Sequence, residues 1–235
     1  MRCRMFDDVV MRREMLSIGF TRRSKFVYEA SWSTQDVQHF IYFGEDSRQY
    51  LVGRFGLRNQ PAEEFGIDSV IKYGHPNLAL IRHSRDPQTA CSMNFEFDRI
   101  NETSRASWPR IRITDMLGSE LATFVAQFIK RHICPLTRHI IDLRSFLAFL
   151  VADREPTPWF ASGPATRAAQ LTAIAVRLEI GTNEIRELLR PHDRSISVGL
   201  FEKRLDPKTC VDRYLDHLIS DWSKMVLAGV RKQHG

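Results

Sequence analysis

Between Asp36 and Asn59, two runs of hydrophobic positions rich in β-branched and aromatic residues flank a polar turn at 44–47. Each run has the period of two that places successive side chains on opposite faces of a strand. Runs joined by a short turn that contains glycine predict an antiparallel β-hairpin. Large apolar side chains occur on both faces of both runs. We therefore expect this hairpin to lie at the centre of a sheet, with neighbours covering each side.

Four shorter segments around the hairpin also have strand patterns: Lys25–Ala30, Leu78–Ile81, Cys91–Phe97 and Arg110–Ile113. The third has four apolar residues on one face and three polar residues on the other, which predicts a half-exposed strand near the sheet edge. The basic residues 21–25, TRRSK, are interpreted as a turn.

Two helices are predicted in the same half of the chain. Asp7 or Asp8 can cap the first, and Gly19 fits its C-terminus. The second begins at Pro61, has acids in its first turn and ends at Gly74. The apolar positions of the first helix include Val9, Val10, Leu16 and Ile18.

After Thr114 the hydrophobic period changes to the 3.6 residues of a helix. The pattern predicts helices over 121–129, over 143–150 with Asp142 as its cap, from Gly163 to Gly181, and over 183–189.

The last helix has the strongest boundary signals, with Asp206 as N-cap, Pro207 at the first helical position and Gly229 at its end. Its broad apolar stripe must be buried. Packing against the preceding helices is favoured, because most amphipathic helices face their own core, and a homodimer through this helix is the alternative. The stripe comprises Val211, Tyr214, Leu215, Leu218, Ile219, Trp222, Met225 and Val226.

These elements predict an α+β fold, in which an antiparallel sheet with one or two helices is followed by a packed helical layer. The change of element type divides the chain into a sheet region, 1–113, and a helical region, 114–235. No flexible linker marks this change, so the alternative is that the two regions are parts of one compact domain.

Composition and charge narrow the function classes only modestly. The net charge is +6, yet residues 1–113 and 114–235 each carry 17 Lys and Arg and 14 Asp and Glu, so no tail or half concentrates positive charge. The four cysteines are scattered without a CxxC pair, which is typical of reduced thiols in a cytosol. No apolar run is long enough to span a bilayer, so we expect a soluble, cytoplasmic protein without a membrane partner.

The sequence carries no recognisable metal, cofactor or catalytic motif. His132, Cys134 and His139 come nearest to a metal site, but Pro135 interrupts the helix between them and a second ligand pair is missing nearby. The glycines in Gly53–Gly56 lie inside a strand pattern, where they favour close packing on the sheet over phosphate binding. We therefore expect no metal and no cofactor, and assign no catalytic residue.

An arginine-flanked aromatic face on the sheet is the one candidate binding surface. Aromatic rings beside arginines can stack single-stranded bases, although rings covered by a helix are the simpler interpretation. The residues of this candidate surface are Phe40, Tyr42, Tyr50, Arg54 and Arg110.

The order of several segments resembles a known family. A helix ending MLSIGF is followed by KFVYEA, an aromatic hairpin ending FGLRN, a helix running into CPL, the segment DLRSFLAFL and the pair RAAQLTAIAVRLEIGTNEIRELL. This order, over about residues 7–189, is similar to the bacterial domain-of-unknown-function family numbered 4304. The resemblance supports the predicted fold and supplies no site residue, because the family has no assigned activity.

Three functions remain open from the sequence. The first is a non-catalytic cytosolic protein that binds a protein partner, such as an accessory, immunity or defence factor in bacteria. The second is nucleic-acid binding through an arginine-rich face. The third is an enzyme whose catalytic residues are far apart in sequence.

Overall fold

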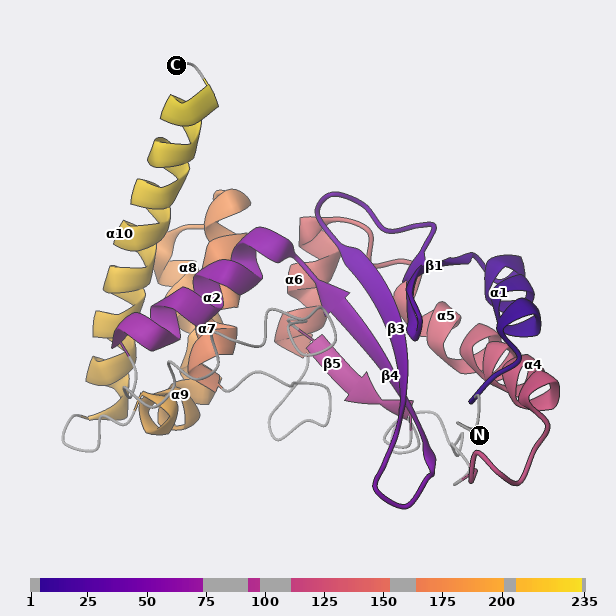
Figure 1. Ribbon diagram of the computed structural model, residues 1–235. Helices are drawn as coiled ribbons and strands as arrows, with labels where there is room; N and C mark the ends of the chain where they lie inside the picture. The colour runs from indigo at the N-terminus through magenta and orange to yellow at the C-terminus, as the bar shows by residue number, and fades with distance from the viewer. Residues whose placement is uncertain (1–4, 74–92, 98–110, 153–163, 201–205, 234–235) are drawn as a thin grey trace. The chain divides into compact units, whose positions relative to one another are not determined.

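The computed structural model describes residues 5–73, 93–97, 111–152, 164–200 and 206–233 (Figure 1). The five strands of an antiparallel sheet all come before residue 97 of the chain, and the elements after them are helical. This arrangement confirms the predicted α+β fold. The strands are β1 (Phe20–Ser24), β2 (Val27–Ala30), β3 (Gln38–Glu45), β4 (Leu51–Arg58) and β5 (Met93–Glu96). The helical elements are α1 (Asp8–Ser17), α2 (Gln60–Tyr73), α4 (Gly118–Phe128), the π-helical turn η3 (Ile129–Ile133), α5 (Cys134–Thr137), α6 (Leu143–Ala152), α7 (Pro164–Arg177), α8 (Thr182–Leu189), the 3₁₀ turn η4 (Arg190–His192), α9 (Asp193–Gly199) and α10 (Pro207–Gln233).

The described residues form two compact units made of interleaved segments. The first unit holds residues 5–58, 93–97 and 111–146, and the second holds 59–73, 147–152, 164–200 and 206–233. These boundaries differ from a single division into 1–113 and 114–235. Helix α2 joins the later helices because it packs on α7, and α4 joins the sheet unit because it packs on α1.

The predicted hairpin is the centre of the first unit. The strand order is β1-β2-β3-β4-β5, and β3 pairs with β4 from Gln38↔Arg58 to Glu45↔Leu51. The acidic turn that joins them is stabilised by Asp46, whose carboxylate accepts hydrogen bonds from the backbone N–H groups of Arg48 and Tyr50. Strand β5 is the last in this strand order, and it lies within Cys91–Phe97, the segment predicted to be a strand near the sheet edge.

Aromatic rings fill one face of this sheet. Phe43 makes edge-to-face contacts with Phe6 before α1 and with Phe97 after β5, and Phe97 also stacks on Phe128 of α4. Gly53 lies opposite Phe43 in the register, and a Cβ placed on it would lie 2.3 Å from Cδ2 of Phe97. The glycine therefore lets the Phe97 ring pack directly on the sheet, as its place in the strand pattern predicted.

One turn prediction was wrong, and one predicted strand is shorter than expected. Residues 21–25 are mostly strand β1 and not a turn, because Phe20 is buried in the core while an edge strand tolerates the arginines beside it. The strand predicted at Arg110–Ile113 is reduced to one isolated bridge, Tyr50↔Arg112, within the described residues. The strand predicted at Leu78–Ile81 lies outside them.

Helix α1 buries only part of its apolar surface. Asp7 caps the helix as expected, by accepting hydrogen bonds from the N–H groups of Val9 and Val10, and Gly19 follows it at φ 90°. Met11 and Met15 are buried, as is Ile18 at the end of the helix, whereas Val9 is 78% exposed and Leu16 is 63% exposed. The helix has apolar residues on both sides, and the methionines are the pair that faces the core.

The second unit is a helical bundle around α7. Ten of the eleven residues 165–175 of α7 are buried, the exception being Thr166, and this helix packs on α2, α8, α9 and α10. Gly66 of α2 comes close enough to α7 that a Cβ on it would lie 2.8 Å from Cγ of Gln170. Gly181 caps the start of α8 and does not end α7, which was predicted to run as far as that glycine.

The apolar stripe of α10 packs against helices of its own chain. Asp206 caps it through the N–H of Thr209, and Trp222 makes an edge-to-face contact with Phe65 of α2. The helix continues through Gly229 to Gln233, so the predicted end was wrong. Within the stripe Met225 is 42% exposed, and a homodimer through this helix stays a prediction.

Candidate functional site

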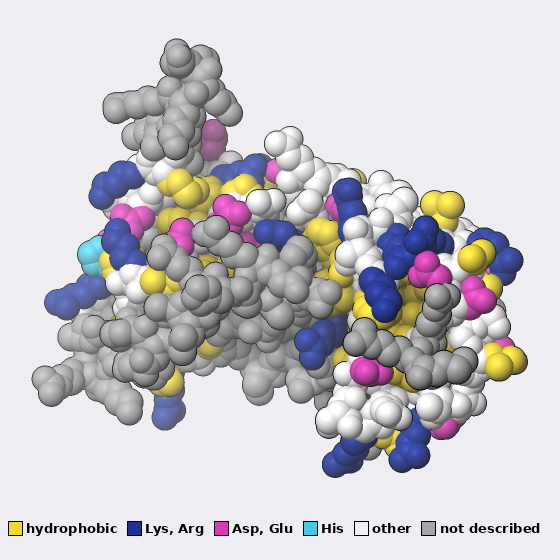
Figure 2. Space-filling model, viewed as in Figure 1, with side chains coloured by type: hydrophobic (Ala, Val, Ile, Leu, Met, Phe, Trp, Pro, Cys, Tyr) yellow, Lys and Arg dark blue, Asp and Glu magenta, His cyan; other side chains and the backbone are white. Residues whose placement is uncertain are grey.

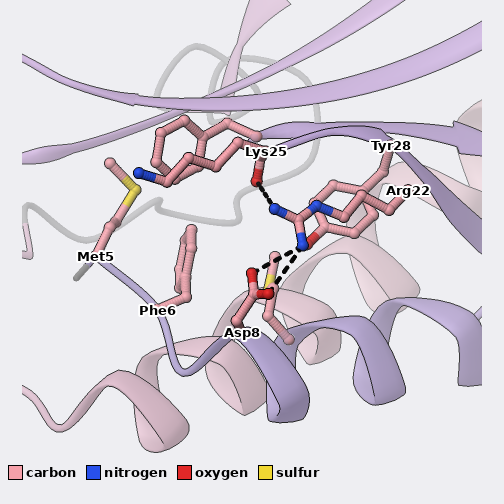
Figure 3. Close-up of a pocket in the computed structure, with 8 residues that line it drawn as sticks. Met5, Phe6, Asp8, Arg22, Lys25 and Tyr28 are labelled. Atoms are coloured by element: carbon pink, nitrogen blue, oxygen red, sulfur yellow. Dashed lines mark hydrogen bonds and ion pairs between the residues drawn. The ribbon is translucent and has the colours of Figure 1, made fainter.

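A pocket opens between α1 and the turn that joins β1 to β2 (Figure 3). Its volume is about 310 Å³, at the lower end of the range for small-molecule sites. All of its lining belongs to the first unit. The residues of this α1–β1 pocket are Met5, Phe6, Asp8, Met11, Arg22, Lys25, Phe26 and Tyr28.

Local structure brings the polar side chains of the pocket together. Asp7 caps α1, so Asp8 stands in its first turn and Met11 follows one turn later on the buried side. Arg22 of β1 is the register partner of Tyr28 in β2. Cross-strand partners place their side chains on the same face of a sheet, so Arg22 and Tyr28 both point toward α1.

Arg22 is fixed by its hydrogen bonds. Its Nη1 donates to both carboxylate oxygens of Asp8, at 2.9 and 3.0 Å, and its Nε donates to the carbonyl of Ser24 at 2.9 Å. Nη2 donates to the carbonyl of Lys25 at 3.3 Å. The bond from Arg22 holds the pKa of Asp8 below its usual value, and Arg12 adds a second ion pair at 3.2 Å. The pair thus ties α1 to the β1–β2 turn.

Lys25 is the polar group of the pocket with the greatest freedom to meet a ligand, and Tyr28 adds a buried hydroxyl to the lining. The Lys25 ammonium lies 4.9 Å from the centre of the Phe26 ring, and it has no carboxylate partner in the part of the chain that the structure describes. The Tyr28 ring is 2% exposed, and burial raises the pKa of its hydroxyl, so the phenol is neutral at pH 7. This lining can bind a molecule, and its cation and phenol fit an anionic group.

A second feature of α1 lies on its opposite side. The α1 outer face consists of Val9, Arg12, Arg13 and Leu16, which share one side because they are spaced by three, four and seven residues. The arginine side chains are 60% and 71% exposed. Leu117, 69% exposed, begins α4 beside this helix, where Gly118 approaches the backbone of Asp7. Figure 2 shows hydrophobic side chains standing out at the right-hand side, where α1 and α4 lie, with Lys and Arg nearby.

The structure places four of the five predicted site residues and brings three of them onto the sheet. Phe40 and Tyr42 point to the same face as Arg54, because Tyr42 is the register partner of Arg54. The two rings are only 6% and 3% exposed, so they present little surface for stacking on a base. Tyr50 lies in the turn region, where its ring meets the Arg112 guanidinium at 5.4 Å. Arg110 lies outside the described residues.

Other titratable groups that could carry chemistry have structural contacts. Both ring nitrogens of His39 are hydrogen-bonded, to Trp32 and to the carbonyl of Ile140. Cys134 is buried, which raises the pKa of its thiol and disfavours the reactive thiolate. Within the described residues no cluster of three His, Cys, Asp or Glu side chains could hold a metal ion. In the same residues no helix is both long and apolar enough to cross a bilayer.

The second unit has a hollow of about 340 Å³ between α8 and α10. Its charged side chains largely neutralise one another, since Arg186 pairs with Asp212 at 3.2 Å and with Asp216 at 2.7 Å. The α1–β1 pocket differs in its aromatic lining, which comes from Phe6, Phe26 and Tyr28.

Sequence reasoning missed the pocket for an identifiable reason. The sequence predicts Asp8 as a possible helix cap and residues 21–25 as a turn, and neither prediction places Asp8 next to Arg22. Alternation of Phe20 and Arg22 with Thr21 and Arg23 was the available signal, because it could have indicated a strand facing α1.

No protein-family model matches this chain, and neither does any curated protein or solved structure. The resemblance to family 4304 therefore stays a prediction.

Proposed function

We propose that this chain is a non-catalytic protein that binds a protein partner through the α1 outer face. The observation that carries the proposal is the exposure of Val9 and Leu16, 78% and 63%, on one side of a helix held in place by Met11 and Met15. Aliphatic side chains two turns apart on one helix face are the anchors of helix-in-groove recognition.

The proposed partner has an apolar groove with carboxylates at its rim. Arg12 and Arg13 lie between the two aliphatic anchors, and both guanidinium groups are exposed in their present ion pairs with Asp8 and Glu14. Exposed pairs contribute about 0–1 kcal/mol, so both guanidinium groups can turn to a partner's carboxylates at little cost. An accessory, immunity or defence role in a bacterial cytoplasm belongs to the same proposal.

Differential affinity capture tests the proposal. The wild-type chain and the double variant Val9→Asp/Leu16→Asp are immobilised and exposed to lysate of the organism that encodes them. Val198→Asp is the matched control, because Val198 is 65% exposed on α9 in the other unit. We expect a protein retained by the wild type and by the control but lost from the double variant.

The captured protein is then purified and its affinity measured by calorimetry. Removing two central anchors should weaken binding by at least about tenfold, while the control leaves it unchanged. Equal affinity for the wild type and the double variant, or loss only in the Val198 variant, would show that the surface is elsewhere.

A further inference from the structure

The geometry of the α1–β1 pocket points to a binding site for a small aryl carboxylate, with the carboxylate at Lys25 and the ring between Phe6 and Phe26. This inference does not depend on a partner at the α1 outer face, because Arg22 holds Asp8 in the pocket even where Arg12 turns away. It assigns a ligand class where the proposed function assigns only a protein partner.

The charge of the ligand follows from which groups in the pocket are already engaged. The Asp8 carboxylate accepts from Arg22 and pairs with Arg12, and the Arg22 guanidinium uses Nε, Nη1 and Nη2 in bonds to its own chain. A ligand cation would have to displace an arginine from Asp8. An anion can bind the Lys25 ammonium directly, since that ammonium has no carboxylate partner among the described residues.

A monoanion fits better than a phosphate. The pocket offers one ammonium with uncommitted donors, and a second negative charge in a partly apolar hollow would lie without a partner. The Tyr28 hydroxyl adds a neutral donor at the end of the pocket closed by Arg22, as Figure 3 shows.

The apolar residues that line the rest of the pocket indicate the uncharged part of the ligand. Figure 3 shows the Lys25 side chain running along one side of the hollow, across from Phe6, with Met5 at the far end. Phe6, Met5 and Met11 are 8%, 8% and 1% exposed, so they are fixed in the core. Rings and thioethers make favourable contacts with an aromatic ring. A volume of 310 Å³ corresponds to roughly ten water-sized groups, about the size of phenylacetate.

The test uses phenylacetate as the probe and phenylacetamide as its neutral counterpart. Binding to the full chain is followed by NMR of ¹³C-methyl methionine, with Met5 and Met11 as reporters in the pocket and Met225 as a reporter outside it. For a ligand of this size we expect a dissociation constant on the order of 1 mM.

Two variants distinguish binding at Lys25 from a general effect of the protein's net charge. Lys25→Met removes the ammonium and should weaken phenylacetate binding by roughly three- to tenfold while leaving phenylacetamide binding unchanged. Lys130→Met removes an exposed lysine of η3 in the same unit and should change neither. Both positions are exposed, so both variants are expected to fold.

Three results would overturn the inference. One is the absence of shifts at Met5 and Met11 up to about 10 mM phenylacetate, an order of magnitude above the expected dissociation constant. Another is equal affinity of the wild type and Lys25→Met for phenylacetate. The third is equal weakening by Lys130→Met, which would indicate that only net charge matters.

Discussion

The indole N–H of Trp32 donates a hydrogen bond to Nδ1 of His39 across 3.3 Å. Because Nδ1 accepts this bond, the proton of the neutral imidazole is on Nε2, which lies 2.7 Å from the carbonyl oxygen of Ile140 and donates to it. His39 is fully buried, and burial lowers its pKa from 6.5 to about 4, while the bond to Ile140 opposes the shift. The ring thus links the sheet to the segment before α6 as a neutral group.

This buried histidine predicts that stability falls in acid. The unfolded chain protonates His39 near pH 6.5, whereas the folded chain keeps it neutral until about pH 4. Stability that is complete above pH 6.5 is therefore lost progressively as the pH falls toward 4, by up to about 3 kcal/mol. Urea unfolding followed by circular dichroism across this pH range measures the loss.

Two substitutions identify the group responsible. His39→Gln should flatten the pH dependence between 6.5 and 4, although it lowers stability at neutral pH. His217→Gln is the control, because the His217 ring is exposed and stacks on Tyr73. If His39→Gln kept the full wild-type slope, another group would be responsible.

Gly53 and Gly44 form a matched pair of glycines in adjacent strands. A Cβ on Gly53 would lie 2.3 Å from the Phe97 ring, whereas one on Gly44 would meet nothing within 4 Å. Gly53→Ala should lower the free energy of unfolding by about 1–3 kcal/mol through overpacking, and Gly44→Ala should change it by less than about 0.5 kcal/mol. Chemical denaturation of both variants checks this; equal effects would mean that Phe97 does not pack on Gly53.

In the second unit, Gly66→Ala tests whether an added methyl group raises or lowers the stability of the protein. In an open helix, Gly→Ala stabilises by about 1 kcal/mol, because glycine is a poor helix former. On α2, however, the new Cβ would lie 2.8 Å from Cγ of Gln170 and 3.1 Å from the backbone oxygen of Thr166. We expect Gly66→Ala to destabilise the protein in thermal unfolding. A raised melting temperature would argue against close packing of α2 on α7.

The two sides of α1 can be distinguished by neighbouring substitutions. Met15 is fully buried and Leu16 is 63% exposed. Met15→Asp should cost several kcal/mol, because it buries a carboxylate without a partner, whereas Leu16→Asp should change stability by less than about 0.5 kcal/mol. Urea titrations of the two variants check the difference, and a large loss in Leu16→Asp would place that side chain in the core.

The sequence predicted elements whose signals are local. The hairpin of β3 and β4 was evident because residues 38–45 and 51–58 are two runs rich in aromatic and aliphatic residues on either side of a short polar turn. The caps Asp7, Asp142 and Asp206 were evident because each carboxylate accepts hydrogen bonds from backbone N–H groups two or three residues later in its own helix.

What depends on tertiary packing could not be predicted in this way. On α1 the pair Val9 and Leu16 and the pair Met11 and Met15 have similar apolar spacing, so periodicity alone could not choose the buried side. The α1–β1 pocket was missed because it arises only where Asp8 meets Arg22, residues separated by fourteen positions in the sequence.

Site-specific photo-crosslinking at α1 examines the proposed function most directly. A photoreactive phenylalanine analogue is placed at Leu16 on the α1 outer face and, in a separate variant, at Val198 on α9. We expect one discrete crosslinked partner from position 16 in cells of the source organism and none from position 198. A partner that crosslinks at position 198 and never at position 16 would show that the α1 outer face is not the binding surface.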